Sequence, residues 1–216
     1  MMRLGRTFVF VVLSMVVGGC ETPQFQTLNI LDTKNRVVAL RAMPDPYGGK
    51  GYDHPVSMTE EDMIRLLQGI RVKRGVIGSS QHPAFSDTEI RLFAPHFVKG
   101  LEKATNQEIL TFFETGHLDS ENDITTSGGL FVAGGHFYVV LSNFSVKTRA
   151  WQDAEQHEAS YRYRPLDQID PQPGQLIFEP RTFMVESPDG EIGNRFKGKP
   201  WQVAIRYQDF LKQPVQ

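Results

Sequence analysis

The chain has 216 residues, of which 40% are hydrophobic, and 23 basic and 25 acidic side chains give it a formal net charge of −2. This length and composition are typical of a single globular domain with one sizeable core. Because nucleic-acid-binding surfaces need clustered Lys and Arg, a mildly acidic chain without a basic face is not expected to bind nucleic acid.

The N-terminal residues have the organisation of an export signal. Arg3 and Arg6 precede an apolar run that extends from Thr7 to Val17. A membrane-spanning helix needs about 20 apolar residues, so this run is too short to span a bilayer comfortably. The pattern therefore predicts a signal peptide over residues 1–19.

The end of this signal carries a specific motif. Val17-Gly18-Gly19-Cys20 contains an aliphatic residue, two small residues and the only cysteine of the chain. It resembles the lipobox of bacterial lipoproteins, although Val17 stands where Leu is more usual. The resemblance implies that a diacylglyceryl group is attached to the Cys20 thiol, that signal peptidase II cleaves before it, and that the new amino terminus is acylated. An ordinary secretory signal that ends before a cysteine is the alternative.

The resemblance also implies a location. Acyl chains contribute about 0.8 kcal/mol per buried CH₂, so the two or three chains on Cys20 would hold the protein on a membrane. In enterobacterial lipoproteins, Asp after the lipidated cysteine favours retention in the inner membrane. Here that residue is Glu21, which favours the outer membrane.

The sequence predicts a tether followed by one domain. Residues 20–34 are polar and lack a strong hydrophobic period, which indicates a tether that holds the domain off the bilayer. Residues 35–216 are expected to form a single domain, beginning with a strand at 37–43 and a loop rich in Pro and Gly. Because long irregular loops are often functional, Tyr47 and Tyr52 in this loop are candidate partner contacts. A plain connecting loop is the alternative.

Two helix starts can be identified from capping boxes, in which a Ser or Thr side chain and an acidic side chain three residues later bind each other's backbone N–H. Ser57 with Glu60 marks the first helix, and Ser86 with Glu89 marks the second. Pro95 should kink or restart the second helix, because its ring removes a hydrogen bond from a helix interior.

The rest of the chain is predicted to be mainly strand. The basic segment 71–74 is most simply the solvent face of a strand, with a lipid or partner contact as the alternative. A hairpin is expected around the Gly134-Gly135 pair. The expected fold is α+β, an antiparallel sheet with two or three packed helices mainly in the N-terminal half. The later strands are expected at 108–115, 125–132, 136–144, 175–187 and 201–207, with a short final helix at 209–212.

No complete motif for a metal, a cofactor or catalysis occurs in the sequence. His157 and the following Glu begin a zinc motif, but the second His is missing. Asp119, Glu121 and Asp123 alternate as in a calcium loop, but Ile124 stands where the sharp turn requires Gly. We therefore predict no catalytic residue, no metal ligand and no cofactor.

Two classes of function remain open. The preferred one is a non-enzymatic docking or accessory lipoprotein of the cell envelope. It would be anchored in the membrane through the lipid on Cys20 and would have other envelope proteins as partners. The alternative is an anchored hydrolase or ligand-binding protein whose site is assembled from residues far apart in sequence. A pocket near His117, His136 or His157 would favour the alternative.

Overall fold

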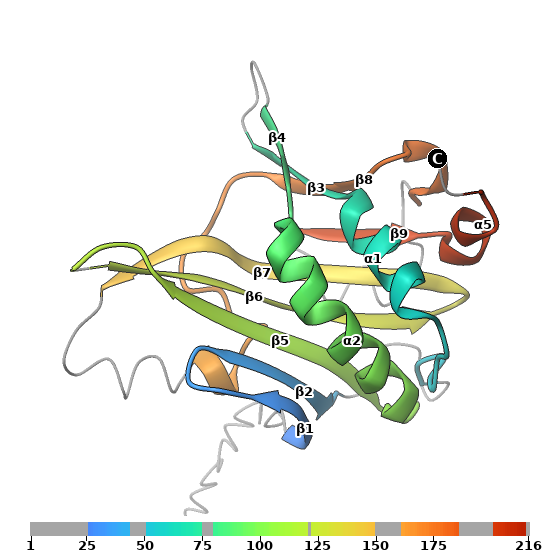
Figure 1. Cartoon of the computed structure of the whole chain (residues 1–216), viewed down its shortest axis with the longest axis horizontal. Helices are drawn as coiled ribbons and strands as arrows, with labels where there is room; N and C mark the ends of the chain where they lie inside the picture. The colour runs from blue at the N-terminus through green and yellow to red at the C-terminus, as the bar shows by residue number, and fades with distance from the viewer. Residues whose placement is uncertain are drawn as a thin grey trace, which may run out of the picture.

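The structure is a computed structural model that describes residues 26–43, 51–74, 80–120, 122–149, 161–185 and 201–214. Within these ranges the chain forms two antiparallel sheets and two substantial helices, and both helices lie in the first half of the sequence (Figure 1). The predicted α+β class is therefore confirmed. None of the helices in the described ranges is long and apolar enough to cross a membrane.

A six-stranded sheet forms the centre of the molecule, and a three-stranded sheet lies beside it (Figure 1). In spatial order the large sheet consists of β1 (Gln26–Asp32), β2 (Arg36–Ala42), β5 (Glu108–His117), β6 (Asn122–Ala133), β7 (His136–Arg149) and β9 (Gln202–Ile205). The small sheet consists of β4 (Ser80–Pro83), β3 (Ile70–Arg74) and β8 (Gln175–Phe178).

The predicted hairpin is confirmed as β6 and β7, which pair from Ala133 and His136 outward. Gly134 and Gly135 form its turn with φ of 57° and 74°, a backbone conformation that residues with a Cβ adopt at a cost. Strand β2 pairs with β5, so segments separated by about 70 residues lie side by side in register.

The predicted tether is wrong from Gln26 onward, because Gln26–Asp32 forms β1 and pairs with β2. The register shifts twice within this short strand, between Gln26 and Leu28 and between Asn29 and Leu31. Each shift breaks the period-2 alternation by which a strand is recognised in sequence. The folded domain therefore begins closer to Cys20 than the sequence indicated.

Helix α1 (Glu60–Gly69) begins two residues later than its predicted start. Its capping box is formed by Thr59 and Asp62, whose backbone N–H donates to the Thr59 Oγ1 at 3.1 Å. Ser57 and Glu60 do not cap it, so the prediction was correct about the helix and wrong about the capping pair.

Helix α2 (Asp87–Lys103) has the predicted capping box of Ser86 and Glu89. It is a single helix that contains Pro95 in its interior, so the predicted restart does not occur. Phe93 and Phe97 are buried on the two sides of Pro95. Their packing against the sheet offsets the hydrogen bond that proline removes.

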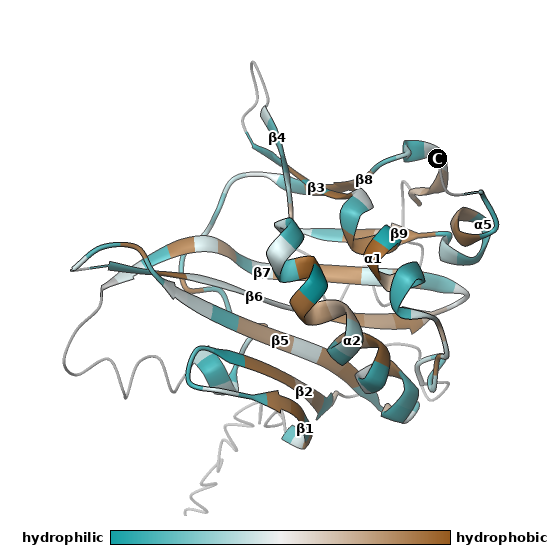
Figure 2. Cartoon of the chain, in the orientation of Figure 1, coloured by the Kyte–Doolittle hydropathy of each residue, from teal (hydrophilic) through white to brown (hydrophobic). Residues whose placement is uncertain are grey.

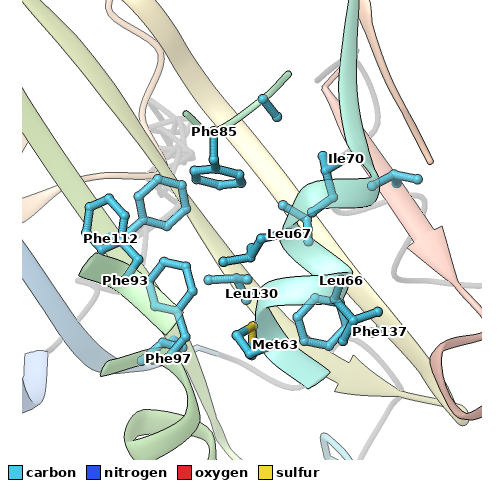
Figure 3. Packing of buried hydrophobic residues seen from close by; sticks show 14 of the residues in the cluster. Met63, Leu66, Leu67, Ile70, Phe85, Phe93, Phe97, Phe112, Leu130 and Phe137 are labelled. Carbon is cyan, nitrogen blue, oxygen red and sulfur yellow. The ribbon is translucent and has the colours of Figure 1, made fainter. Parts of the chain in front are cut away.

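Helices α1 and α2 pack on one face of the large sheet and bury the main core. Figure 2 shows that hydrophobic positions gather on the sheet strands and on these helices. Figure 3 shows the side chains that meet between them, including Met63, Leu66 and Leu67 from α1. Phe112 of β5 lies among rings from α2, which joins the helix to the sheet.

The opposite face of the sheet is covered by the segment 161–169 and contains buried polar groups. Ser127 and Ser142 donate to the backbone oxygens of Pro165 and Leu166, each at 2.8 Å. Arg41 is 1% exposed and donates through Nε to Thr111 Oγ1 at 3.0 Å. Burial lowers the pKa of Arg41 to about 10, so its guanidinium stays charged at neutral pH.

Candidate functional site

The described part of the chain contains a groove of about 540 Å³ at the β9 side of the molecule. Three separate segments form it: the second half of α1, the connection from β8 into the short 3₁₀ helix η1 (Arg181–Phe183), and α5 (Tyr207–Leu211) with the residues after it. Its lining residues are Arg65, Gln68, Gly69, Glu179, Pro180, Thr182, Phe183, Phe210, Gln213 and Pro214.

Arg65 connects two walls of the groove. Its Nη1 and Nη2 donate to the backbone oxygens of Leu211 at 3.2 Å and Gln213 at 2.7 Å. Its guanidinium carbon lies 5.2 Å from the centre of the Phe210 ring. A guanidinium carries five N–H donors; two of them make these bonds, and Nη1 also lies 4.0 Å from Asp62 Oδ1.

The third wall is held against α1 by close backbone packing. The Gly69 oxygen accepts a hydrogen bond from the Glu179 backbone N–H at 2.8 Å. A Cβ at Gly69 would lie 2.4 Å from the Phe178 ring, so a larger residue cannot be accommodated there without a shift. Phe210 meets Phe178 and Phe183 edge to face at 5.0 and 5.5 Å, which fixes α5 relative to β8 and η1.

The groove is therefore amphipathic. Phe183, Phe210 and two prolines supply apolar surface, and Arg65 and Gln68 supply donors. Glu179 supplies a carboxylate whose Oε2 lies 3.9 Å from Nε of Arg71. Such a surface can hold an extended chain by pairing its backbone carbonyls and packing one apolar side chain.

The strand predicted at the basic segment 71–74 is confirmed as β3. Val72 is buried, whereas Arg71, Lys73 and Arg74 are partly exposed. Arg74 lies over the rings of Phe144 and Trp201, at 5.0 and 5.7 Å from their centres. Arg71 contacts Glu179, so both arginines of β3 interact with other side chains of the protein.

Tyr52 is a core residue, so its predicted role as an exposed contact does not fit the structure. It is 3% exposed and lies 5.2 Å from the Phe131 ring. Its backbone N–H donates to the Asn106 oxygen at 2.7 Å, which ties this part of the loop to the body. Tyr47 and Cys20 lie outside the described residues.

The histidines of the described part do not converge. His54 is 8% exposed, and its Nε2 accepts from the Val132 backbone N–H at 3.0 Å. Burial lowers the pKa of His54 below its ordinary value, which keeps the ring neutral. His117 Nδ1 lies 2.6 Å from Asp123 Oδ1 in an exposed pair, and His136 lies edge-on to Tyr138.

His157 and Glu121, which belonged to the rejected metal motifs, lie outside the described residues. Among the residues that the structure describes, no three His, Cys, Asp or Glu side chains are close enough together to hold a metal ion.

Searches with protein-family models, with curated proteins and with solved structures found no significant match to this chain.

Proposed function

We propose that this chain is a lipid-anchored protein of the bacterial cell envelope, attached through Cys20 and acting as a non-enzymatic docking or accessory protein. The observation that carries the proposal is Val17-Gly18-Gly19-Cys20 at the end of a charged and apolar signal. Glu21 after the cysteine favours attachment to the outer membrane rather than the inner membrane.

The groove supports the docking half of the proposal. Its occupant in this proposal is an extended segment of another envelope protein. The Arg65 guanidinium and the side chain of Gln68, which line the groove, would bind its carbonyl or carboxylate oxygens, and Phe183 and Phe210 would contact an apolar side chain.

The anchor is tested by replacing the lipidated residue. Cys20→Ser removes the acceptor thiol and leaves the folded domain unchanged. The parent protein should incorporate labelled palmitate and fractionate with the outer membrane, whereas the variant should take up no label and leave the membrane fraction. A variant that stays membrane-bound, together with a parent that takes up no label, would refute the anchor.

The docking role is tested by photo-crosslinking in the envelope. A photoreactive amino acid at Thr182, an exposed groove residue, should give a discrete protein adduct. The same amino acid at Lys99, an exposed position on α2 outside the groove, is the matched control. Identical adduct patterns at the two positions, or no adduct at Thr182, would contradict docking at the groove.

A small-molecule-binding protein is the second candidate, because the groove volume lies within the range of about 300–1,000 Å³ that is common for ligand sites. Thr182→Trp would fill part of the groove. A low-molecular-weight fraction of the envelope that raises the melting temperature of the parent but not of Thr182→Trp would favour this candidate over protein docking.

A further inference from the structure

The position of β1 determines how far the domain can stand from the membrane. Five residues separate Cys20 from Gln26, where β1 begins. Six consecutive Cα steps span at most about 21 Å even when the chain is fully extended. If Cys20 carries the lipid, as the proposed function requires, the start of β1 cannot lie further than this from the headgroups.

The groove lies at the opposite side of the large sheet. Strand β1 is one edge of the six-stranded sheet and β9 is the other. Five interstrand spacings of about 4.8 Å place these two edges about 24 Å apart. η1 and α5 lie beyond β9, since Arg206 donates its backbone N–H to the Phe183 oxygen at 2.8 Å, and Figure 1 shows them on the side away from β1.

Two large apolar side chains are exposed at the β1 side. Leu28 on β1 is 41% exposed, and Tyr163 is 56% exposed. Tyr163 belongs to this side because the neighbouring Arg162 bonds to Asp32 and donates to the Lys34 oxygen at 2.8 Å. Lys34 itself is exposed in the turn between β1 and β2. An apolar residue, a tyrosine and a lysine form the mixture that suits a headgroup region.

We propose that the surface made by Leu28, Lys34 and Tyr163, here called the β1 surface, rests on the bilayer that holds Cys20, and that the groove faces away from it. A second copy of the chain is a poorer occupant of this surface. The two register shifts in β1 disturb the regular ladder that a partner strand would need. Lys34 attracts an anionic headgroup, which gives the lipid surface a favourable charge contact.

The single cysteine makes the orientation measurable. Once Cys20 is lipidated, a cysteine introduced elsewhere is the only free thiol. The lipidated protein would be reconstituted into vesicles of phosphatidylethanolamine and phosphatidylglycerol that carry a headgroup-attached quencher. A fluorophore would be placed at Leu28→Cys or Tyr163→Cys on the β1 surface, and at Gln68→Cys or Thr182→Cys in the groove.

With the edges about 24 Å apart, quenching at residues 28 and 163 should exceed quenching at 68 and 182 at least about twofold. Two positions on each side keep the comparison valid if one variant fails to fold. Equal or reversed quenching would overturn the orientation. Self-quenching at residue 28 that increases with protein density in the vesicles would overturn lipid as the occupant in favour of a second copy.

A variant with altered charge tests whether the β1 surface contacts the lipid headgroups or only lies near them. Lys34→Glu combined with Leu28→Asp, labelled at Tyr163→Cys, should lose at least about half of the quenching while the protein stays vesicle-bound through its lipid. Unchanged quenching would overturn the contact. If the parent protein carries no lipid and does not bind vesicles, both the proposed anchor and the proposed orientation are refuted. If the parent binds vesicles but labels on the β1 surface and in the groove are quenched equally, only the orientation is refuted.

Discussion

Replacing Phe112 by alanine should remove the centre of the aromatic cluster between α2 and the large sheet. Phe112 is 1% exposed, and its ring centre lies 5.6, 5.7 and 5.5 Å from those of Phe85, Phe93 and Phe97. These three rings are themselves buried (Figure 3). They have little freedom to collapse into the space that Phe112 would leave, so the substitution should create a cavity.

We expect Phe112→Ala to lower the free energy of unfolding by about 4 kcal/mol, since Phe-to-Ala changes in cores cost about 3–5 kcal/mol. This is a large share of the total stability, which for native proteins is about 5–15 kcal/mol. Phe112→Leu is the matched control. It retains most of the apolar contact and should cost about 1.5 kcal/mol.

The two variants can be compared by urea unfolding of the mature chain with Cys20→Ser. Tryptophan fluorescence suits the assay, because Trp201 is 1% exposed and should change its environment on unfolding. With a denaturant slope of about 2.5 kcal/mol per molar urea, Phe112→Ala should lower the midpoint by about 1.6 M. A loss below about 1 kcal/mol, or equal losses for the two variants, would refute the tight packing on which the magnitude rests.

Three further predictions follow from individual contacts. Burial lowers the pKa of His54 in the folded state, so the unfolded chain binds a proton at this residue more readily. The free energy of unfolding should therefore fall as the pH drops below about 6.5. Urea unfolding at a series of pH values should show a smaller fall for His54→Gln than for the parent. Gly128→Ala should lower the melting temperature, since its Cβ would lie 2.0 Å from the Val140 oxygen, and a melting temperature equal to that of the parent would contradict this. Ser86→Ala removes the acceptor for the Glu89 backbone N–H and should cost about 1 kcal/mol in urea unfolding.

The features that could be predicted from sequence depend on neighbouring residues. The capping box of Ser86 and Glu89 is complete within four residues, and the hairpin at Gly134-Gly135 needs only two glycines between apolar segments. Pro95 misled the prediction because the burial of Phe93 and Phe97, which keeps α2 continuous, depends on a sheet formed elsewhere in the chain.

The groove could not be predicted, because α1 is more than 100 residues away in sequence from the two other segments that form it. Arg65, Glu179 and Phe210 share no local motif. The interpretation of Tyr52 was wrong for the same reason. A loop composition indicates exposure, but the bond from Tyr52 to the distant Asn106 places its ring in the core.

The order of strands in the large sheet has a consequence for chain synthesis. Five of its six strands end at or before Arg149, but the last, β9, begins only at Gln202. Until β9 arrives, β7 is an unpaired edge along Phe137–Val140, where it later pairs with Gln202–Ile205. Exposed apolar edges are templates for aggregation. A chain that stops before Gln202 would therefore retain an unpaired edge on β7. Such prematurely terminated products should be found as aggregates or as substrates of proteases.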